Sequence, residues 1–562
     1  MTTPQWWREA VCYQIYPRSF ADSNRDGIGD IQGIIDKLDY LAWLGVTVLW
    51  ISPFYPSAQL DWGYDISDYT DVHPDYGNLA DVDRLIAEAH KRGIRILLDL
   101  VLNHTSDQHQ WFMQARSSRD NPYRDWYVWR DAKAESPPND WESIFGGSAW
   151  EWDPLTEQYY YHFFFKEQPD LNWRNPQVRQ AIYDVMRFWL NRGVDGFRLD
   201  AIGSLFEDEH LTNSSVEGTL EAMFIGARSG VFEDWELMGR KMRYQMNLPE
   251  IHRVLAAMRS LVNEYGDRVL LGESADESLC GNGHDQLHSV FNFGLTDTPL
   301  NAARLYAQLA ERHARFPDAA QDCNTLSNHD RRRSYSVYAD GKHDAQRARL
   351  ALALVTFLSG TPVYYYGEEI GMTNLEFTDL DQLRDEFGIR FYHILRERYG
   401  IDHEEAFNTA ARFMGRDGSR TPMQWSGQPG AGFTSEHIDS WLPIHSNHML
   451  GVNVEAQRAD ARSMLTFFRD IVRLRQQNPA LTKGSIALLP PHGDVLAFWR
   501  KAAEQQCLIA LNISEDPGML PIGAASLYSL YNTGVYPANA QNGTLYLEPY
   551  QLYVGEQKGE DS

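Results

Sequence analysis

Acidic residues that close apolar segments are the features of this sequence best suited to chemistry. Asp200 closes GFRLD, Glu273 closes LLGE and Asp330 closes LSNHD. A single acidic residue in such a place can simply cap the next helix or pair with an arginine. Three that converge on one site suit glycosidic-bond cleavage, in which one carboxylate attacks the anomeric carbon and a protonated one donates to the leaving oxygen. That chemistry needs no organic cofactor.

Basic residues accompany these carboxylates. Arg198 lies two residues before Asp200, so on a strand both side chains point to the same side, where the guanidinium can keep Asp200 ionised. Glu273 must instead stay protonated near neutral pH, and we therefore expect it to lie away from Arg198 and near other acids. His104 ends a further apolar segment and His329 directly precedes Asp330, and a satisfied core histidine is the alternative for each.

The elements that must position these residues are strands alternating with helices. Short β-branched runs alternate with helical patterns such as Ile31–Gly45 and Pro176–Gly193, whose apolar residues recur at i, i+3, i+4 and i+7. This alternation predicts an α/β fold with a parallel sheet. The eight predicted strands are Val11–Pro17, Val46–Pro53, Ile94–His104, Val194–Asp200, Arg268–Ser274, Leu287–Phe293, Cys323–Asp330 and Thr361–Glu369.

Eight such units are typical of a (β/α)8 TIM barrel, in which catalytic residues lie where the strands end. A doubly wound open sheet is the alternative. We expect the barrel to comprise residues 1–104 and 173–480, with an inserted B subdomain at 105–172, after the third strand. A second insert, polar and irregular, is expected at 373–460, after the eighth strand. Short strands predict a separate antiparallel β domain at 481–562.

The composition limits the possible partners. The chain has 562 residues, and a formal charge of −26 argues against nucleic acid or an anionic membrane. Its 17 Trp, 29 Tyr and 25 Phe suit sugar stacking as well as ordinary packing. Four cysteines without paired spacing predict a reducing compartment, the cytoplasm. No apolar run approaches the roughly 18 residues of a membrane span, and Met1–Trp7 show no signal pattern.

Five motifs between Asp99 and Asp330, in the family's order, resemble the α-amylase superfamily of glycoside hydrolases (glycoside hydrolase family 13), in its α-glucosidase and oligo-1,6-glucosidase branch. The resemblance covers nearly the whole chain. The motifs are DLVLNH at Asp99–His104, QPDLNW at Gln168–Trp173, GFRLD at Gly196–Asp200, GE at Gly272–Glu273 and NHD at Asn328–Asp330. The resemblance implies that Asp200 is the nucleophile and Glu273 the general acid/base. It also implies that Asp330 holds the glucosyl ring near the transition state.

The same resemblance implies a closed pocket for one glucose. His104 and His329 would bind its hydroxyls, Tyr64 would stack on it, and Asp61 would hold its non-reducing end. Arg416, which opens RDGSRTPMQW, would join Asp61 there, although a plain salt bridge that closes the insert is the alternative.

Further residues would form the wall and rim of this pocket. Phe145, Phe164 and Gln168 are candidate wall residues, and packing within the insert is the alternative for the two phenylalanines. Trp62 stands where the branch has a small polar residue, which would alter the rim.

A loop after the first predicted strand carries alternating oxygen ligands. It begins like an EF-hand, but Gly33 stands at position twelve, where a glutamate is required. The oxygens still suit a hard cation, and the resemblance implies a structural Ca²⁺ or Mg²⁺ remote from the catalytic mouth. A metal-free Asx turn is the alternative. The ligands would be Asp22, Asn24, Asp26, the Ile28 carbonyl and Asp30.

These residues together predict an exo-acting, retaining α-glucosidase that acts on a small oligosaccharide or α-glucoside through a covalent glucosyl-enzyme. Within the branch, α-1,6 enzymes tend to carry Val after the nucleophile and α-1,4 enzymes Ala or Thr, so Ala201 favours α-1,4 links. We expect a monomer or small homo-oligomer.

Three other functions stay open. A sucrose isomerase or other transglucosylase would use the same site, but Phe291–Leu300 lacks the arginine-rich loop of sucrose isomerases. A trehalose-6-phosphate hydrolase would need cations for the phosphate, and Arg331 and Arg332 are the candidates, standing where the family commonly has an uncharged residue and a proline. A non-catalytic relative would have lost the catalytic residues and carry a membrane anchor, and the sequence shows neither change.

Overall fold

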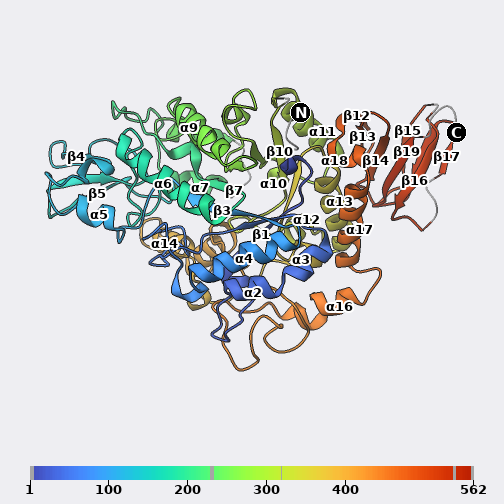
Figure 1. The fold of residues 1–562 in the computed structure, drawn as a ribbon, viewed down its shortest axis with the longest axis horizontal. Helices are drawn as coiled ribbons and strands as arrows, with labels where there is room; N and C mark the ends of the chain where they lie inside the picture. The colour runs from blue at the N-terminus through green and yellow to red at the C-terminus, as the bar shows by residue number, and fades with distance from the viewer. Residues whose placement is uncertain (1–4, 228–232, 318, 524, 536–538, 558–562) are drawn as a thin grey trace.

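Eight parallel strands form a closed barrel at the centre of the molecule. The computed structural model describes residues 5–227, 233–317, 319–523, 525–535 and 539–557 (Figure 1). The strands pair in the order β1-β11-β10-β9-β8-β7-β3-β2, which confirms the TIM barrel and excludes the open sheet. They are β1 (Cys12–Ile15), β2 (Val48–Ile51), β3 (Arg95–Val101), β7 (Gly196–Asp200), β8 (Val269–Gly272), β9 (Ser289–Asn292), β10 (Gln321–Thr325) and β11 (Thr361–Tyr365).

Most of the predicted strands run too far at their carboxyl ends. β3 ends at Val101 and β10 at Thr325, whereas we expected them to continue to His104 and Asp330. The last residues of these segments leave the sheet and turn over the barrel mouth. This departure lets their polar side chains face a cavity instead of the packed barrel interior.

The outer layer consists of helices whose apolar faces cover the sheet. In α6 (Pro176–Arg192), the Asn175 side chain caps the first turn, Pro176 occupies the first helical position and Gly193 ends the helix at a φ of 104°. The expected helix at Ile31–Gly45 is two helices, α2 (Ile31–Asp36) and α3 (Leu38–Leu44), separated at Lys37. Other long barrel helices are α4 (Leu79–Lys91), α9 (Ile251–Glu264), α11 (Ala302–Arg315), α13 (Asp344–Phe357) and α17 (Met464–Gln477); short helices include α1 (Pro17–Phe20), α10 (Gly294–Asp297), α12 (Ser334–Tyr338), α16 (Val454–Arg458) and α18 (Pro479–Lys483).

The segment after β3 holds a small sheet at one end of the molecule. Its strands β4 (Trp129–Arg130), β6 (Gln158–Tyr161) and β5 (Trp150–Asp153) pair antiparallel in that order, beside α5 (Gln110–Ala115) (Figure 1). A bridge between His104 and Asp170 ties the end of this segment back to the loop after β3. The segment therefore stands over the barrel mouth.

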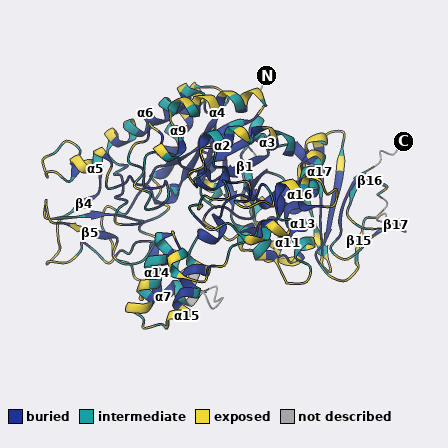
Figure 2. Cartoon of the chain, turned by 90° about the horizontal axis from the view of Figure 1, so that it is seen from below, coloured by how far each residue is buried: buried dark blue, intermediate teal, exposed yellow. Residues whose placement is uncertain are grey.

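Helices occupy much of the segment after β11, which we expected to be irregular. These are α14 (Glu386–Glu397), α15 (His403–Thr409) and a π-helical turn, η8 (Ala410–Met414). They pack beside α7 (Leu220–Ala227), which follows β7 together with α8 (Glu233–Met242) (Figure 2). The expectation of an irregular segment was wrong. The helical pattern of α14 is weak in the sequence because the helix buries only a narrow apolar stripe, with Phe391 and Leu395 on it.

Antiparallel sheets complete the chain at the end opposite β4–β6, as predicted (Figure 1). Arg500, in the larger of these sheets, is buried and donates to the carbonyls of Phe357 and Leu358, which fixes that sheet against the end of α13. One sheet has the order β12 (Ser485–His492), β13 (Val495–Lys501), β14 (Gln506–Asn512), β19 (Leu552–Gln557) and β16 (Leu527–Asn532), and the other β15 (Gly518–Pro521), β18 (Thr544–Leu547) and β17 (Asn539–Gln541).

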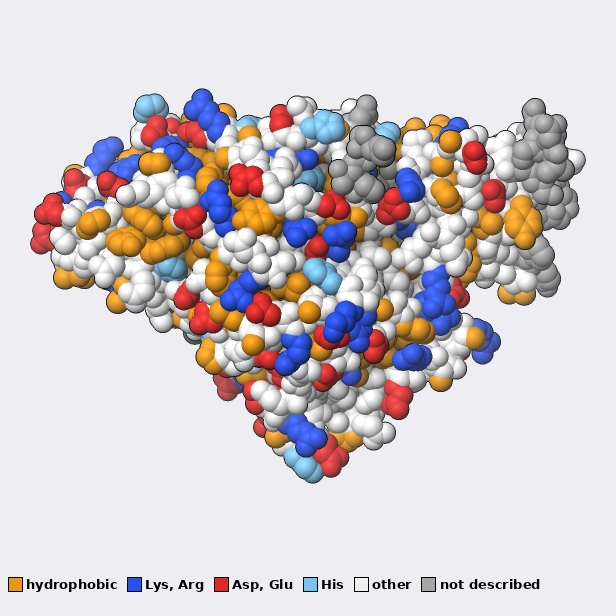
Figure 3. Space-filling model, in the orientation of Figure 1, with side chains coloured by type: hydrophobic (Ala, Val, Ile, Leu, Met, Phe, Trp, Pro, Cys, Tyr) orange, Lys and Arg blue, Asp and Glu red, His pale blue; other side chains and the backbone are white. Residues whose placement is uncertain are grey.

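The distribution of charged side chains, the cysteines and the helix lengths can be compared with what the composition predicted. Acidic and basic side chains are interspersed on the face seen in Figure 3, so the acidic excess is not gathered in one patch there. The four cysteines are buried and unpaired. Within the described residues, no helix combines the length and apolar character that crossing a bilayer requires. The boundaries of the three predicted regions stay predictions.

Candidate active site

Residues from the ends of several barrel strands meet in one cavity of about 390 Å³. Asp200 ends β7, Glu273 follows β8, His329 and Asp330 follow β10, and His104 follows β3. The cavity brings together ten of the twelve predicted catalytic and substrate-binding residues: Asp61, Tyr64, His104, Phe145, Phe164, Asp200, Glu273, His329, Asp330 and Arg416. The other two, Arg198 and Gln168, are fully buried behind this lining and contact it.

One wall is built on the buried guanidinium of Arg198. Its Nη1 donates to Asp99 Oδ1 at 2.7 Å and to Asp200 Oδ1 at 2.6 Å, and its Nη2 lies 2.9 Å from Glu273 Oε2. We call Arg198, Asp99, Asp200 and Glu273 the Arg198 cluster. The parallel register places Arg198 beside Asp99 on β3 and beside Leu271 on β8, so the carboxylates converge on it from both sides.

The expectation that Glu273 lies away from Arg198 was wrong. Glu273 is two residues beyond Leu271, which puts it level with Asp200 across neighbouring strands. Both of its polar contacts use Oε2, from Arg198 and from the backbone N–H of Ala201 at 2.9 Å. Its side chain is 23% exposed and lines the cavity, and neither of these two contacts uses Oε1.

Charge in the Arg198 cluster is only partly balanced. Burial raises the pKa of Asp200 well above its usual range, Arg198 opposes the rise, and Glu273 and Asp99 add to it. Burial also raises the pKa of Asp99, and Arg198 and the hydrogen bond from Trp50 Nε1, at 3.0 Å, oppose that rise. Tyr64 Oη donates to the same carboxylate, also at 3.0 Å. One guanidinium faces three carboxyls, and the cluster therefore retains a shared proton more readily than isolated carboxylates would.

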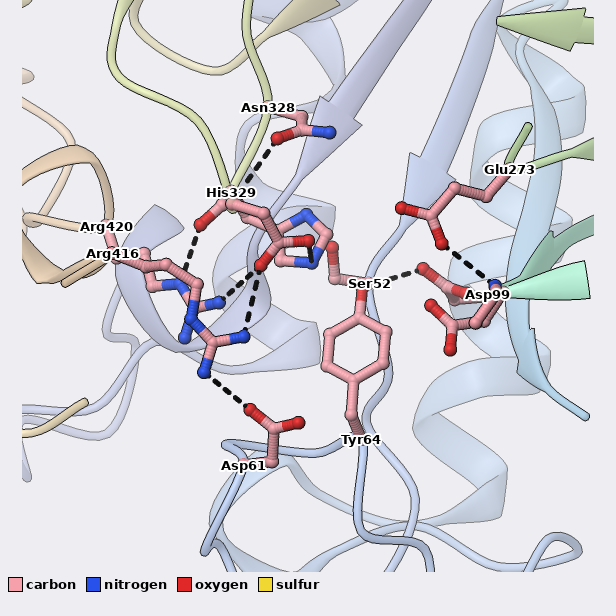
Figure 4. A network of polar contacts seen from close by, with 12 residues as sticks. Ser52, Asp61, Tyr64, Asp99, Glu273, Asn328, His329, Arg416 and Arg420 are labelled. Carbon is pink, nitrogen blue, oxygen red and sulfur yellow. Dashed lines mark hydrogen bonds and ion pairs between the residues drawn. The ribbon is translucent and has the colours of Figure 1, made fainter. Parts of the chain in front are cut away.

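The opposite wall is built around Asp330, which three basic residues contact. These residues, His329, Arg416 and Arg420, lie on the side of the site away from Glu273 (Figure 4). Asp330 Oδ1 accepts from Arg420 Nη2 at 2.8 Å and Arg416 Nη1 at 3.3 Å, and Oδ2 lies 3.0 Å from His329 Nε2. Burial opposes ionisation of Asp330, but His329, Arg416 and Arg420 outweigh it and hold the pKa of this carboxyl well below its usual range. Asp330 is therefore a fixed anion.

Arg416 links this carboxylate to two more. Its Nη2 donates to Asp61 Oδ1 at 2.8 Å and to Asp385 Oδ1 at 2.6 Å, and its Nε and backbone N–H both donate to Asp385 Oδ2. Asp385 also caps α14. The Asp330 cluster, consisting of Asp330, Asp61, Asp385, Arg416 and Arg420, thus joins the β2 loop to the segment after β11.

Aromatic and imidazole rings separate the two clusters. Tyr64 stacks on His329, with centroids 5.1 Å apart and planes within 3°, and in Figure 4 it lies between Asp61 and Asp99. His104 Nε2 contacts the Tyr64 carbonyl and Gln168 Nε2, both at 3.0 Å, and Gln168 also donates to Asp61. Burial lowers the pKa of His104 to about 4, so it is neutral at pH 7.

The two phenylalanines predicted to form the cavity wall line the cavity and also pack against other aromatic rings. Phe145 and Phe164 line the cavity, and Phe145 also packs on Phe165 and on Phe387 of α14, with centroids 4.4 and 4.5 Å apart. Trp62 is absent from the described cavity lining. Its ring contacts Trp441 and its Nε1 donates to the Arg384 carbonyl, so it fastens the β2 loop to the later insert.

The arginines considered for phosphate binding lie elsewhere. Arg331 Nη1 donates to Thr296 Oγ1 and Asp297 Oδ1, both at 2.6 Å, and its guanidinium covers the Phe293 ring. Arg332 is exposed. Neither belongs to the described lining of the cavity.

The proposed metal loop is held by its own hydrogen bonds. Asp22 accepts from the backbone of Arg25 and Gly27, and Asp30 accepts from Ser23 and caps α2 through Gly33. Asn24 and Asp26 bond to each other, and Ile28 donates its N–H to Asp26. Over the part of the chain that is described, no three His, Cys, Asp or Glu side chains are placed to hold a metal ion. The metal stays a prediction.

Sequence reasoning missed three charged residues that hold the two clusters of this site, besides the apolar side chains that line its outer part. Asp99 opens the motif DLVLNH, so its place on the strand beside Arg198 was available as a signal. Arg420 stands four residues after Arg416 in the same quoted segment. Asp385 carried no local signal, because its contact with Arg416 spans 31 residues and depends on α14.

Known proteins resemble this chain over most of its length. The sequence model of the alpha-amylase catalytic domain matches residues 14–484. The chain is 39% identical to the oligo-1,6-glucosidase of Parageobacillus thermoglucosidasius, over 91% of each chain, and 42% identical to a probable alpha-glucosidase of Rhizobium meliloti (strain 1021), over 91% of this chain and 90% of the relative.

Similar proteins also include enzymes that are named for other activities. The trehalose-6-phosphate hydrolase of Bacillus subtilis (strain 168) is 35% identical, over 90% of this chain and 89% of the relative. The crystal structure of the trehalulose synthase MutB from Pseudomonas mesoacidophila MX-45 superposes with a TM-score of 0.89 at 34% identity, covering 99% of this chain and all of that one. A MutB mutant has been solved in complex with the substrate sucrose. This chain belongs to the α-amylase family, glycoside hydrolase family 13, and is a glycoside hydrolase of the α-glucosidase type.

Proposed function

We propose that this glycoside hydrolase is an exo-acting, retaining α-glucosidase that removes single glucose units from short oligosaccharides. The observation that carries the proposal is the pairing of Asp200 and Glu273 on adjacent nitrogens of one guanidinium. That pairing favours the spacing of about 5 Å found in retaining enzymes over the wider spacing that lets water attack directly.

Asp200 serves as the nucleophile in this proposal. Arg198 occupies its Oδ1 and holds the side chain in place, which leaves the second oxygen to attack the anomeric carbon. As the glycosidic bond breaks, Glu273 gives the proton on Oε1 to the leaving oxygen. The resulting ester on Asp200 is hydrolysed when Glu273 takes a proton from water, so glucose leaves with the α configuration.

Asp330 and Asp61 bind the glucose that is transferred. A fixed anion at Asp330 can hold ring hydroxyls and stabilise the positive charge that develops on the ring. The Arg416 bonds to Asp61 and Asp385 connect two loops at the inner end of the cavity, which supports room for one non-reducing glucose there. His104 and Gln168, both buried, supply further hydrogen-bonding groups beside Asp61.

We also propose that α-1,4 links are preferred over α-1,6 links. Ala201 lines the cavity directly after the nucleophile and has a φ of 42°, in the left-handed region. A β-branched side chain is strained in that conformation and would project further toward the leaving group. The Ala201 methyl leaves this space open.

The other two activities of similar proteins are weaker candidates. An isomerase or transglucosylase would share the whole inner cavity, and it differs in what attacks the glucosyl-enzyme. A trehalose-6-phosphate hydrolase would need a cation near the leaving group, and Arg331 is engaged by Asp297 outside the described lining. The substrate that is consumed, together with the product that is formed from it, therefore distinguishes these activities.

A substrate panel tests the proposal. The enzyme is incubated separately with maltose, isomaltose, maltotetraose, sucrose, trehalose and trehalose 6-phosphate, with Asp200→Asn as the blank. We expect maltose to be cleaved faster than isomaltose, and maltotetraose to yield glucose and maltotriose first. Maltose as the first product would overturn exo action, and cleavage of trehalose 6-phosphate alone would overturn the substrate class.

We further propose that the loop of Asp22, Asn24, Asp26, Ile28 and Asp30 takes Ca²⁺ or Mg²⁺. All five groups are oxygen donors, which suits a hard cation, and burial raises the pKa of Asp30, a carboxyl that a cation would stabilise. The ion would brace the loop and would take no part in the reaction. After EDTA treatment, Ca²⁺ should raise the Tm of the wild type and not that of Asp26→Asn. An unchanged wild-type Tm with either ion would refute the site.

Two expectations about the whole protein remain proposals. Buried, unpaired cysteines support a cytoplasmic location. We propose a monomer or small homo-oligomer, which light scattering would measure.

A further inference from the structure

Trp62 directly follows Asp61, and it lies outside the described cavity lining to which Asp61 belongs. Its backbone has a φ of 48°, in the left-handed region, which a residue with a bulky side chain rarely adopts. Such a conformation persists only where surrounding contacts hold it, and it is often found at functional sites. The contacts of the Trp62 side chain therefore show what the β2 loop is held against.

Groups from two other segments hold the indole of Trp62. The guanidinium of Arg18 lies over the ring, with Cζ 4.9 Å from the centroid, and the Trp441 ring packs on it with centroids 5.0 Å apart. Arg18 is buried and donates to Tyr76 Oη at 3.2 Å. Trp62 Nε1 donates to the Arg384 carbonyl at 3.0 Å. Trp62 thus ties the β2 loop to α1 and to the segment after β11.

The indole hydrogen bond closes a ring of contacts around Arg416. Arg416 Nη2 donates to Asp61 Oδ1 at 2.8 Å, a contact drawn in Figure 4, and to Asp385 Oδ1 at 2.6 Å. Asp385 directly follows Arg384, whose carbonyl accepts from Trp62, and Trp62 directly follows Asp61. The two loops are therefore joined inside the cavity by the ion pair and outside it by the indole. Because these two ties are neighbours in the chain, the indole fixes the separation of Asp61 and Arg416.

A line of aromatic rings connects Trp62 with the tyrosine that lies between the two clusters. Trp441 packs against Tyr16, with centroids 6.1 Å apart, and Tyr16 stacks on His329 at 5.9 Å. His329 in turn stacks on Tyr64 at 5.1 Å. Rings packed this closely transmit a displacement from one to the next. Trp62 therefore supports the rings of the inner cavity as well as its ion pair.

We propose that Trp62 is a positioning residue that preforms the glucose pocket by holding Asp61 and Arg416 in contact before a sugar binds. This inference rests on the proposed function, in which these two residues hold the terminal glucose. Without the indole, the sugar itself would have to bring the two loops together, and the free energy of ordering them would be subtracted from that of binding. The pair that transfers the proton is held by the Arg198 cluster on other strands. Loss of Trp62 should therefore weaken glucose binding and raise KM with little change in kcat.

Two variants of Trp62 separate its ring from its N–H group. Trp62→Phe keeps a ring against Trp441 and Arg18 and removes the donor to Arg384, whereas Trp62→Ala removes both. We expect the glucose Kd, measured by titration calorimetry, and the KM for maltose to rise about threefold in Trp62→Phe and at least about tenfold in Trp62→Ala. The kcat should stay within about twofold of the wild type. Unchanged constants in a folded Trp62→Ala, or a fall in kcat alone, would overturn the proposal.

Trp43 provides the matched control. Its ring is also half-buried beside two arginines, with Cζ of Arg458 and Arg469 4.6 and 4.8 Å from the centroid, and it lies outside the described cavity lining. Trp43→Phe and Trp43→Ala should leave the glucose Kd and KM unaltered, even where Tm falls as far as in the Trp62 variants. An equal rise in the glucose Kd would show a general effect of lost tryptophan packing and would overturn the assigned role.

A double-mutant cycle with Arg416→Lys tests whether Trp62 acts through the ion pair. If it does, adding Trp62→Phe to Arg416→Lys should raise the glucose Kd by less than about twofold more, because the contact that the indole supports is already weakened. Effects of the two substitutions that simply multiply would overturn the positioning role.

Glucose binding also separates this inference from the proposed function. A wild type that binds glucose, together with a Trp62→Ala variant that binds it equally tightly, would refute only the positioning role. A wild type that neither binds glucose nor cleaves maltose would refute the proposed function, and the role of Trp62 with it.

Discussion

The two charged clusters differ in their balance of basic and acidic groups. In the Arg198 cluster one guanidinium contacts three carboxyls, whereas in the Asp330 cluster two guanidiniums, together with His329, contact three carboxyls. In the first arrangement burial raises the pKa of Asp200, and Glu273 and Asp99 add to the rise that Arg198 opposes. The second pushes the pKa of Asp330 well below its usual range. The difference fits where the proposed mechanism needs protons: the Arg198 cluster would hold and release one in each cycle, and the Asp330 cluster would stay anionic throughout.

The largest effects should come from the two carboxylates of the Arg198 cluster that face the substrate. We expect Asp200→Gly and Glu273→Ala each to lower kcat by at least about 10³-fold, because one removes the covalent step and the other the proton transfer. Rates with 4-nitrophenyl α-glucoside and maltose measure this, with circular dichroism as the folding control.

Azide distinguishes the two roles. With Asp200→Gly it should occupy the nucleophile's place and give β-glucosyl azide, and with Glu273→Ala it should attack the intermediate and give α-glucosyl azide. If Asp200→Gly gave the α-azide and Glu273→Ala the β-azide, the roles of nucleophile and acid/base would be exchanged between the two residues.

The next largest effect concerns the shared arginine. Arg198→Lys replaces a fork that contacts three carboxyls by a single point charge, and we expect kcat to fall about 10²-fold. Arg198 lowers the pKa of Asp200, so its loss raises that pKa further, and the acidic limb of kcat/KM should move to higher pH.

The corresponding change in the other cluster should behave differently. In Arg420→Lys the acidic limb should stay in place, because Arg416 and His329 still keep Asp330 ionised. A limb that moves equally in both variants would show that the clusters titrate as one unit.

Arg416→Lys should have a smaller effect, mainly on binding. Its contacts with Asp61, Asp385 and Asp330 position the glucose pocket and do not touch the proton-transferring pair, so we expect KM to rise about tenfold with little change in kcat. Arg331→Lys, at an arginine paired outside the described cavity lining, is the matched control and should leave both constants unaltered. A large loss of kcat in Arg416→Lys would contradict this division of roles.

The smallest effect should come from Ala201→Val. A branched side chain at a φ of 42° strains the backbone and narrows the cavity next to Glu273. We expect the maltose-to-isomaltose ratio of kcat/KM to fall by a few fold, about 1 kcal/mol in activation free energy. An unaltered ratio would show that Ala201 does not determine the linkage preference.

Much of this site could be predicted because a closed barrel brings the carboxyl ends of its strands together. Asp200, Glu273 and Asp330 needed only their places at strand ends to be grouped. The contact of Glu273 with Arg198 could not be predicted, since it depends on the register that sets Arg198 beside Leu271. Asp385 was not predicted because helix α14, which it caps, was not predicted. The contact of Trp62 with Trp441 could not be predicted either, because it joins two loops that are distant in the sequence.

The initial configuration of released glucose tests the central claim most directly. Maltose is added to the enzyme in an NMR tube, and the anomeric signals of free glucose are followed before mutarotation, with an Asp200→Asn sample as blank. Because Asp200 and Glu273 share one guanidinium and act by double displacement in this account, α-glucose should appear first. Initial accumulation of β-glucose would contradict it.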